Sequence, residues 1–402
     1  MTTAGTTARP ARYRPRLVRR ARTTIAAGVT SLVLAVGSFV AIAGPSQAAP
    51  GVSCTGSTVH ASAVQEGSTW RAYRGSTPVY SGTNMLTAVQ TAINSLPAGR
   101  TSKQRVVVNG SGSMPATSRI TLPSYTTFES CGTIHVTGTG TGNVAGIYAR
   151  GATDIEVARF HLTGSPQYGI FLRNVDNVRL RDIDLRLTSA TVLGVRVDNL
   201  GDTSRYAKNI TMNTVYVSGV GDQAVETYGV DGLTIGTVTA RDVGGSGLLL
   251  NNTINAKVSL VDAKNAGTGT GYAAFRIANR AGRVGSSYPT NIEVGTVRAS
   301  GGGRGIFCVS ESGGLRVNKV ELTNTGNNPV LIENCYNVSL ATTSGTIAGA
   351  GDVRLSERAE FAGNRDITLR NLKLSGGARV VEKPCADNLV ISNVTGGTIT
   401  RC

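Results

Sequence analysis

The sequence predicts an all-β fold, a parallel β-helix of about ten coils, and three observations support this prediction. A phrase made of a small residue, alternating apolar and variable positions and often a final asparagine recurs at steps of 23 to 31 residues. A second alternating run follows most of these phrases, and 51 glycines suit the many turns. The phrases begin at Gly146, Gly169, Gly194, Ala224, Gly247, Ala274, Gly305 and Pro329.

Alternation with period two, rich in Val, Ile, Leu and Thr, favours strands over helices. The second runs are residues 154–157, 177–180, 209–212, 232–235, 291–294, 314–317, 337–340 and 366–369. Two or three short strands per coil would stack at about 4.8 Å. The final asparagines could then form a ladder at an inner corner, suit the turns, or do both. These asparagines are Asn174, Asn199, Asn252, Asn279 and Asn334.

The first 48 residues differ from the rest and predict an export signal. They carry seven arginines and no acid, then an apolar stretch near residues 25–43, then Ser46-Gln47-Ala48 as a cleavage site. Arg19-Arg20 is a weak hint of the twin-arginine route. Residues 49–402 are expected to form one domain, with a capping region at about 49–105 and coils at about 106–402. No second hydrophobic span follows, so we expect a soluble, secreted product without a membrane segment.

A short helix is expected over residues 84–96, capped by Thr83 or Asn84 and ended by Gly99. It would place Leu86, Val89 and Ile93 on one face. Such a helix would cover the open end of the first coil, as the terminal caps of solenoids do.

Charge suggests the kind of partner. Without the seven signal arginines the net charge falls from +16 to +9. A basic exported protein is suited to acidic polymers such as uronate polysaccharides, although the charge also fits a merely solubilising surface. No basic and aromatic cluster typical of nucleic-acid binding is present, so we expect no nucleic-acid partner.

Six cysteines follow the signal, and an even number in an exported chain suggests disulfides. The coil alignment places Cys308 and Cys335 about one coil apart, although Cys308 also suits a free core thiol. Cys385 with Cys402 would clip the C-terminal end, and Cys54 with Cys131 would close the N-terminal one.

The chain resembles the secreted right-handed parallel β-helix proteins of the pectate-lyase-like (pectin-lyase-like) superfamily. The resemblance rests on the helix, on Val106–Val108, on Ile120–Phe128 leading to Cys131–Ile134, and on the coils that follow. The resemblance covers roughly residues 80–402. The export signal, basicity and glycine content of the chain also resemble those of actinobacterial members. The resemblance implies a right-handed solenoid but no single activity, because this fold hosts lyases, hydrolases, adhesins and structural proteins. The adjacent aspartates and the Gly-His-Gly segment of polygalacturonases are absent.

Two columns of outward side chains follow from stacking the phrases. Polar and charged residues concentrate in the middle coils of both columns, which makes them the candidate floor of a groove. The first column is Tyr148, Phe171, Arg196, Glu226, Leu249, Arg276, Phe307 and Leu331, and the second is Arg150, Arg173, Asp198, Tyr228, Asn251, Ala278, Val309 and Glu333.

Two insertions at one corner, residues 200–208 and 280–290, would wall this groove roughly 14 Å apart. Function on solenoids concentrates where loops depart from the repeat. The candidate substrate-binding residues are therefore Arg173, Asn251, Arg205, Tyr206, Arg280, Arg283 and Tyr288.

The first candidate chemistry is β-elimination of a uronate polymer, in which a cation neutralises the carboxylate and a base removes the neighbouring proton. Arg173, Arg196 and Arg276 would hold carboxylates, with Tyr228 or an arginine as the base. Asp198, Asp222 and Glu226 are candidate calcium ligands, and no other cofactor is expected.

The second candidate is an inverting glycoside hydrolase that uses Glu226 and Asp198, whose Cβ atoms are expected about 8 Å apart. Arg196 beneath Glu226 is expected to keep that glutamate ionised, which leaves Asp198 or Asp222 as the acid. Arg196 and Glu226 also fit a simple surface ion pair. The sequence thus favours a lyase on an acidic polysaccharide, with a hydrolase and a non-catalytic glycan-binding protein as alternatives.

Overall fold

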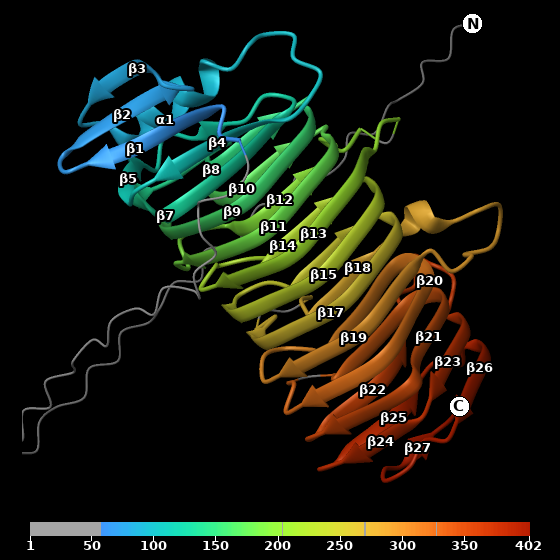
Figure 1. Cartoon of the computed structure of the whole chain (residues 1–402). Coiled ribbons are helices and arrows are strands. Elements are labelled where there is room, and N and C mark those ends of the chain that lie inside the picture. Colours follow the sequence, from blue (N-terminus) through green and yellow to red (C-terminus); the bar gives the residue numbers. More distant parts are fainter. Residues whose placement is uncertain (1–57, 203, 269–270, 327) are drawn as a thin grey trace, which may run out of the picture. The chain divides into compact units, whose positions relative to one another are not determined.

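The computed structural model describes residues 58–402 except 203, 269–270 and 327, so the predicted export signal and Cys54 lie outside the described residues. Contacts place Val52–Cys402 in one unit. This unit is a parallel β-solenoid of about 13 turns. Figure 1 shows how its strands stack. The prediction of about ten coils was too low because the coils before Gly146 and after Asn334 lack the repeated phrase.

One face of the solenoid, called here the first face, contains the repeated phrases as short parallel strands. In β20 and β21 the phrase continues without a break into the next strand of the coil. The strands of the first face are β6 (Ile120–Thr121), β8 (Ala145–Arg150), β10 (Tyr168–Arg173), β12 (Leu193–Asp198), β14 (Val225–Tyr228), β16 (Leu248–Asn251), β18 (Phe275–Ala278), the beginnings of β20 (Ile306–Thr323) and β21 (Val330–Ala348), β22 (Gly351–Ser356), β25 (Ala378–Glu382) and β27 (Ile399–Thr400).

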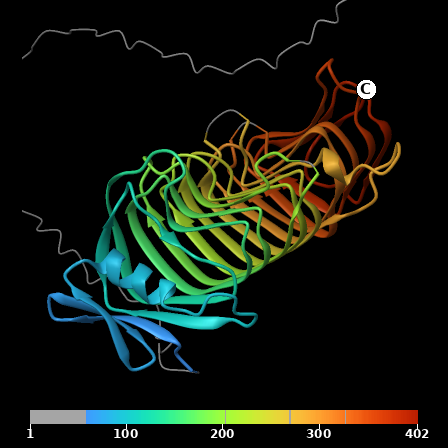
Figure 2. The same ribbon diagram turned by 90° about the horizontal axis from the view of Figure 1, so that it is seen from above.

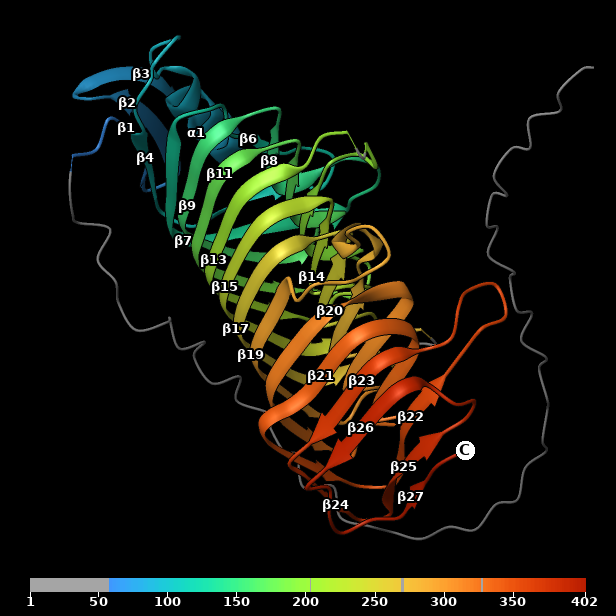
Figure 3. The ribbon, with the colours of Figure 1, turned by 90° about the vertical axis from the view of Figure 1, so that its right-hand side faces the viewer.

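The remaining two faces are formed mainly by long strands that bend in the middle, as Figure 3 shows for β11, β13, β15 and β17. In β11 (Asp176–Leu187) every second residue is buried except at Arg181 and Asp182, which are both exposed and mark the bend. The other strands of these faces are β4 (Gln104–Asn109), β5 (Gly112–Pro115), β7 (Thr126–Thr139), β9 (Thr153–Ser165), β13 (Ala207–Ser218), β15 (Val230–Val243), β17 (Ile254–Ala266), β19 (Ile292–Ser300), β23 (Arg365–Arg370), β24 (Leu372–Ser375) and β26 (Asp387–Ser392).

A helix and a small antiparallel sheet lie at the N-terminal end of the stack, as Figure 2 shows. Helix α1 (Met85–Asn94) begins at the N-cap Asn84, whose side chain accepts a hydrogen bond from the Thr87 backbone N–H, as predicted. It ends at Ser95, not at Gly99, because the Ser95 N–H already closes the last turn. The antiparallel strands were not predicted; they are β1 (Ala61–Glu66), β2 (Thr69–Arg74) and β3 (Thr77–Gly82).

The buried asparagines of the phrases hold loops instead of forming the predicted ladder. Asn199 Nδ2 donates to the backbone carbonyls of Asp202 and Arg205, at 2.6 and 3.0 Å. Asn334 Nδ2 likewise donates to three carbonyls of the loop after β22. The residue stacked on Asn199 in the next coil is Gly229, which has no side chain to continue a ladder. Asparagines do contact each other at another corner, where Asn209 Nδ2 donates to Asn177 Oδ1.

Two predicted disulfides are formed, Cys308–Cys335 and Cys385–Cys402, so Cys308 is not a free thiol. Cys131 is also disulfide-bonded, and its predicted partner Cys54 lies outside the described residues. Among the residues that the structure describes, no helix is long and apolar enough to cross a membrane.

Candidate functional site

The two predicted columns are present on the first face. In the first column Phe171 is paired with Arg196, Arg196 with Glu226, Glu226 with Leu249, and Leu249 with Arg276. In the second column Arg173 is paired with Asp198. The strand register therefore brings the predicted charged residues together along the axis of the solenoid.

Asp198 is the most enclosed of these charges, with 1% of its side chain exposed. Arg173 donates to both of its oxygens, at 2.6 and 2.8 Å, and Arg196 Nε donates to Oδ2 at 2.8 Å. Burial alone would raise the pKa of Asp198, but the hydrogen bonds from the two arginines outweigh it and hold the pKa below its ordinary value. Asp198 thus stays ionised and is not the proton donor of the predicted hydrolase.

Glu226 behaves differently although it is bound to the same arginine. Arg196 Nη1 donates to Glu226 Oε2 at 3.0 Å, and Asn251 Nδ2 donates to Oε1 at 2.9 Å. Burial nevertheless raises the pKa of Glu226, and the Asp222 carboxylate raises it further against the effect of Arg196. Arg196 lowers the pKa of Glu226, as expected, but burial raises it by more. Arg196 is also shared with Asp198. Glu226 is placed to accept or donate a proton.

Asp222 lies in the turn before β14 and extends the site beyond the columns. Burial raises its pKa, and the side chains of Gln223 and Tyr272 interact with its carboxylate. Tyr272 lies in the turn before β18, and burial followed by the charge of Asp222 raises the pKa of its hydroxyl. Asp222, Glu226 and Tyr272 form a group of proton-transfer side chains, called here the carboxylate cluster.

Two arginines have buried N–H groups without acceptors: Arg276, which lies next to the carboxylate cluster, and Arg304, which lies next to Arg276. Among the described residues, nothing accepts a hydrogen bond from Nε of Arg276 or from Nε and Nη1 of Arg304. Both guanidinium groups lie over the ring of Phe307, at 5.4 and 5.1 Å from its centre. Burial lowers the pKa of both arginines. Unpaired buried donors are costly, so this pair, called here the arginine pair, is suited to an anionic ligand.

Three loops leave the solenoid at the corner after the first face. The predicted loops at 200–208 and 280–290 are joined by a third after β22, which returns Arg358 towards the arginine pair. Arg358 forms ion pairs with Glu333 and Glu360, at 2.9 and 3.0 Å. The loop with the short helix η1 (Arg280–Gly282) projects from this edge in Figure 1.

The loop side chains predicted to bind substrate mostly contact the protein itself. Arg205 lies 3.6 Å from Asp176, Arg280 3.1 Å from Glu311, and Arg283 Nε donates to a carbonyl of its own loop. Burial raises the pKa of Tyr206.

Tyr288, the fifth loop residue, is 5% exposed and stacks on Tyr336. Its hydroxyl donates to the Glu311 carbonyl. It therefore supports the loop and does not face a ligand.

The predicted calcium ligands do not form a metal site. Across the described part of the chain, no three His, Cys, Asp or Glu side chains are placed to hold a metal ion. Asp198 is already bound by two guanidinium groups, which repel a cation. Tyr228, the predicted base, is half-buried on β14 in register with Asp198 and Asn251.

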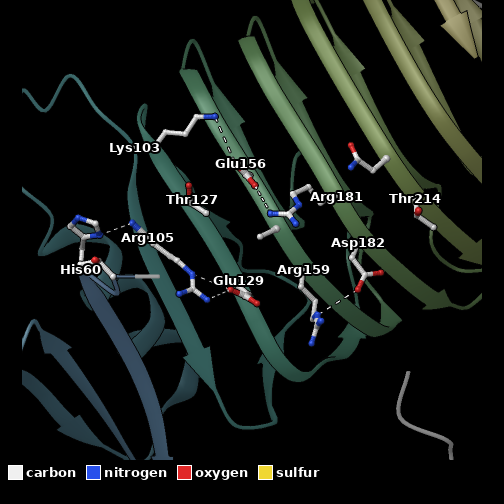
Figure 4. Close-up of a pocket in the computed structure, with 13 residues that line it drawn as sticks. His60, Lys103, Arg105, Thr127, Glu129, Glu156, Arg159, Arg181, Asp182 and Thr214 are labelled. Atoms are coloured by element: carbon white, nitrogen blue, oxygen red, sulfur yellow. Dashed lines mark hydrogen bonds and ion pairs between the residues drawn. The ribbon is translucent and has the colours of Figure 1, made fainter. Parts of the chain in front are cut away.

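A cavity of about 720 Å³ lies elsewhere, over β4, β7, β9, β11 and β13, as Figure 4 shows. Its charged side chains bind one another: Glu156 contacts Lys103 and Arg181, at 3.8 and 3.3 Å. Arg159 contacts Asp182 at 3.4 Å. No residue of the two columns lines this cavity. We place the candidate site on the first face because unsatisfied donors and shifted carboxyl groups occur there.

The sequence did not reveal Tyr272 or Arg304, because both lie in turns outside the repeated phrase. One signal was present: Tyr272 precedes Arg276 by four residues, as Asp222 precedes Glu226. Because Arg276 and Glu226 lie in the same column, this equal spacing places Tyr272 and Asp222 in a row parallel to that column.

Comparison with known proteins gives no family model and no curated protein that matches this chain. Solved structures with a similar fold include ORF18 of Geobacillus virus E2, at 12% identity and TM-score 0.36, covering 77% of this chain and 58% of that one. A surface adhesin of Streptococcus pneumoniae has 11% identity and TM-score 0.40, with 79% and 90% covered. The A-module of a mannuronan C-5 epimerase from Azotobacter vinelandii has 12% identity and TM-score 0.33, with 79% and 96% covered. This chain spans less than two thirds of the viral protein, and likenesses this weak identify neither a family nor an activity.

Proposed function

We propose that this protein is a secreted enzyme that cleaves an acidic, uronate-containing polysaccharide by β-elimination. The observation that carries the proposal is the arginine pair: Arg276 and Arg304 hold buried N–H groups without acceptors beside carboxyl groups of raised pKa. Export rests on the predicted signal at residues 1–48 and on disulfides, which are typical of oxidising compartments.

In this mechanism the arginine pair binds the uronate carboxylate. Charge neutralisation acidifies the proton on the carbon next to the carboxylate, since the negative charge that develops on its removal is stabilised by the same guanidinium groups. Arginine suits this role because its N–H groups match a carboxylate in two parallel hydrogen bonds.

Glu226 is the proposed base. Its raised pKa makes it a stronger proton acceptor than an ordinary carboxylate. Tyr272 is the proposed donor to the oxygen of the leaving sugar, because its raised pKa keeps the hydroxyl protonated and Asp222 orients it. The reaction breaks the bond between carbon and the glycosidic oxygen and leaves an unsaturated uronate end.

A hydrolase remains the second candidate for one specific reason. Burial raises the pKa of both Asp222 and Glu226, and the Asp222 carboxylate raises the pKa of Glu226 further. Two carboxyl groups of which one keeps its proton are the acid and base that glycoside hydrolysis needs. This pair replaces Asp198 and Glu226 of the sequence prediction.

The test is to incubate the purified protein with pectic, alginate, glucuronan and glycosaminoglycan substrates and to follow ultraviolet absorbance and reducing ends together. A rise in both means β-elimination. Reducing ends without absorbance mean hydrolysis and refute the proposal. No change in either signal on any substrate also contradicts it and favours a non-catalytic glycan-binding protein.

Matched variants then identify the residues. Glu226→Gln should abolish turnover, whereas Glu321→Gln, which removes a carboxylate from an exposed ion pair with Arg298, should not. Arg304→Gln should lower kcat/KM about 10- to 100-fold, since a charged hydrogen bond contributes about 1.5–3 kcal/mol. Arg298→Gln removes the same charge elsewhere and should leave kcat/KM unchanged.

A further inference from the structure

The first column changes its electrostatic character along the solenoid axis. From β10 to β14 the charges of this column, Arg196 and Glu226, and those of the adjoining second column, Arg173 and Asp198, are matched by hydrogen bonds among these four residues. The stretch spans two coil steps, about 10 Å, which is longer than one pyranose ring. Its N-terminal edge is aromatic: the half-buried Tyr168 packs in a tilted arrangement against the fully buried Phe171, with 4.6 Å between the ring centres. We call this stretch the neutral half.

The other half of the column is cationic. From β18 to β20 it contains the arginine pair and the Phe307 ring, and nothing among the described residues accepts the buried N–H groups. Leu249 lies between the halves, next to Glu226, which ends the neutral half and belongs to the carboxylate cluster, where the bond would be cleaved. Beyond the neutral half, towards the N-terminus, Arg119 and Arg150 are exposed.

A polymer lying along this column would meet unlike surroundings on the two sides of the cleaved bond. A uronate over the arginine pair supplies the negative charge and the hydrogen-bond acceptors that these guanidinium groups do not find in the protein. A second uronate over the neutral half would find both arginines occupied and two carboxylates nearby, so its burial would be unfavourable. A neutral sugar meets hydrogen-bonding groups and an aromatic ring without that cost.

We propose that the site selects a mixed polymer, in which the uronate that is cleaved is linked to a neutral sugar on the leaving side, over a homopolymer of uronates. The inference rests on the proposed function for the location of the cleaved bond. The exposed Arg119 and Arg150 extend the pattern, because they suit a further acidic residue beyond the neutral one.

The test measures binding and cleavage separately. Calorimetry with Tyr272→Phe, which removes the proposed proton donor without changing a charge, compares two alternating tetrasaccharides with two homouronate tetrasaccharides. Hyaluronan and unsulfated chondroitin serve as alternating ligands, and oligogalacturonate and oligoguluronate as homouronates. We expect an alternating ligand to bind at least tenfold more tightly, and wild-type kcat/KM to follow the same order.

Equal or tighter binding of the homouronates, or binding of neither class, overturns the inference. Preferential binding of an alternating ligand without cleavage by the wild type supports it while refuting β-elimination. Asp198→Asn supplies a second test, because it frees positive charge in the neutral half. The preference should then fall severalfold, and an unchanged preference in the folded variant counts against the inference. If this variant does not fold, the comparison of ligands with Tyr272→Phe decides alone.

Discussion

Gly245 leaves the space that the Asp222 carboxylate occupies. A Cβ atom on residue 245 would collide with Asp222 Oδ1 and with Gln223 Oε1. Gly245 precedes Leu249 by four residues, so it lies in the row of Asp222 and Tyr272, one coil from each. The absence of a side chain at this position is what allows Asp222 and Tyr272 to interact across the coil between them.

Gly245→Ala should therefore lower activity by displacing Asp222. We expect kcat/KM to fall roughly tenfold or more, because small displacements of reacting groups have effects of up to about 100-fold. Overpacking should reduce the free energy of unfolding by about 1–3 kcal/mol, which leaves the protein folded. Steady-state kinetics and urea unfolding check both values. Full activity in a folded variant would show that the contact between Asp222 and Tyr272 is not needed.

The columns were predictable because parallel coils repeat their register, so that equal offsets place Arg196 beside Glu226. Side-chain directions were not predictable from register. The Arg173 and Arg196 side chains both turn towards Asp198, and the pKa of Glu226 is set mainly by its burial, which the register does not give. Site residues in the turns were not predictable either. Tyr272 and Arg304 lie in connections of unequal length, where alternation of apolar and polar residues gives no signal.

The pH dependence of kcat/KM should report the Glu226 carboxyl. The base must be ionised, so activity should rise as pH increases through a pKa above the ordinary 4.5 of a glutamate. Asp222→Asn removes a negative charge that raises this pKa, so the rising limb should move to lower pH. Asp222→Asn should also lower the rate, because Tyr272 loses its orienting partner. A limb that stays in place in Asp222→Asn would assign it to another group.

Asp198 should contribute to stability rather than to turnover. Its pKa is lowered in the folded state, so its stabilisation is complete above the ordinary value of 3.8 and is lost as pH falls through the folded pKa below that value. Asp198→Asn leaves Arg173 without an anion and Arg196 with Glu226 alone, which should cost about 3–5 kcal/mol at neutral pH. The difference from the wild type should shrink below pH 3.8. Urea unfolding at several pH values measures it, and a difference that does not depend on pH would contradict this account.

The two described disulfides should differ in how far their effects extend. Cys308–Cys335 closes 27 residues within the core, and its removal by Cys308→Ala with Cys335→Ala should cost about 3–4 kcal/mol of unfolding free energy. Cys385–Cys402 encloses β26 and β27, the last two strands. Among the named strands, β26 pairs only with β23 and β27 only with β25. Since coils in a solenoid are stabilised by their neighbours, removal of this disulfide should increase hydrogen exchange in residues 387–400 and leave the middle coils protected. Equal loss of protection along the whole solenoid would instead show that the C-terminal clip stabilises every coil.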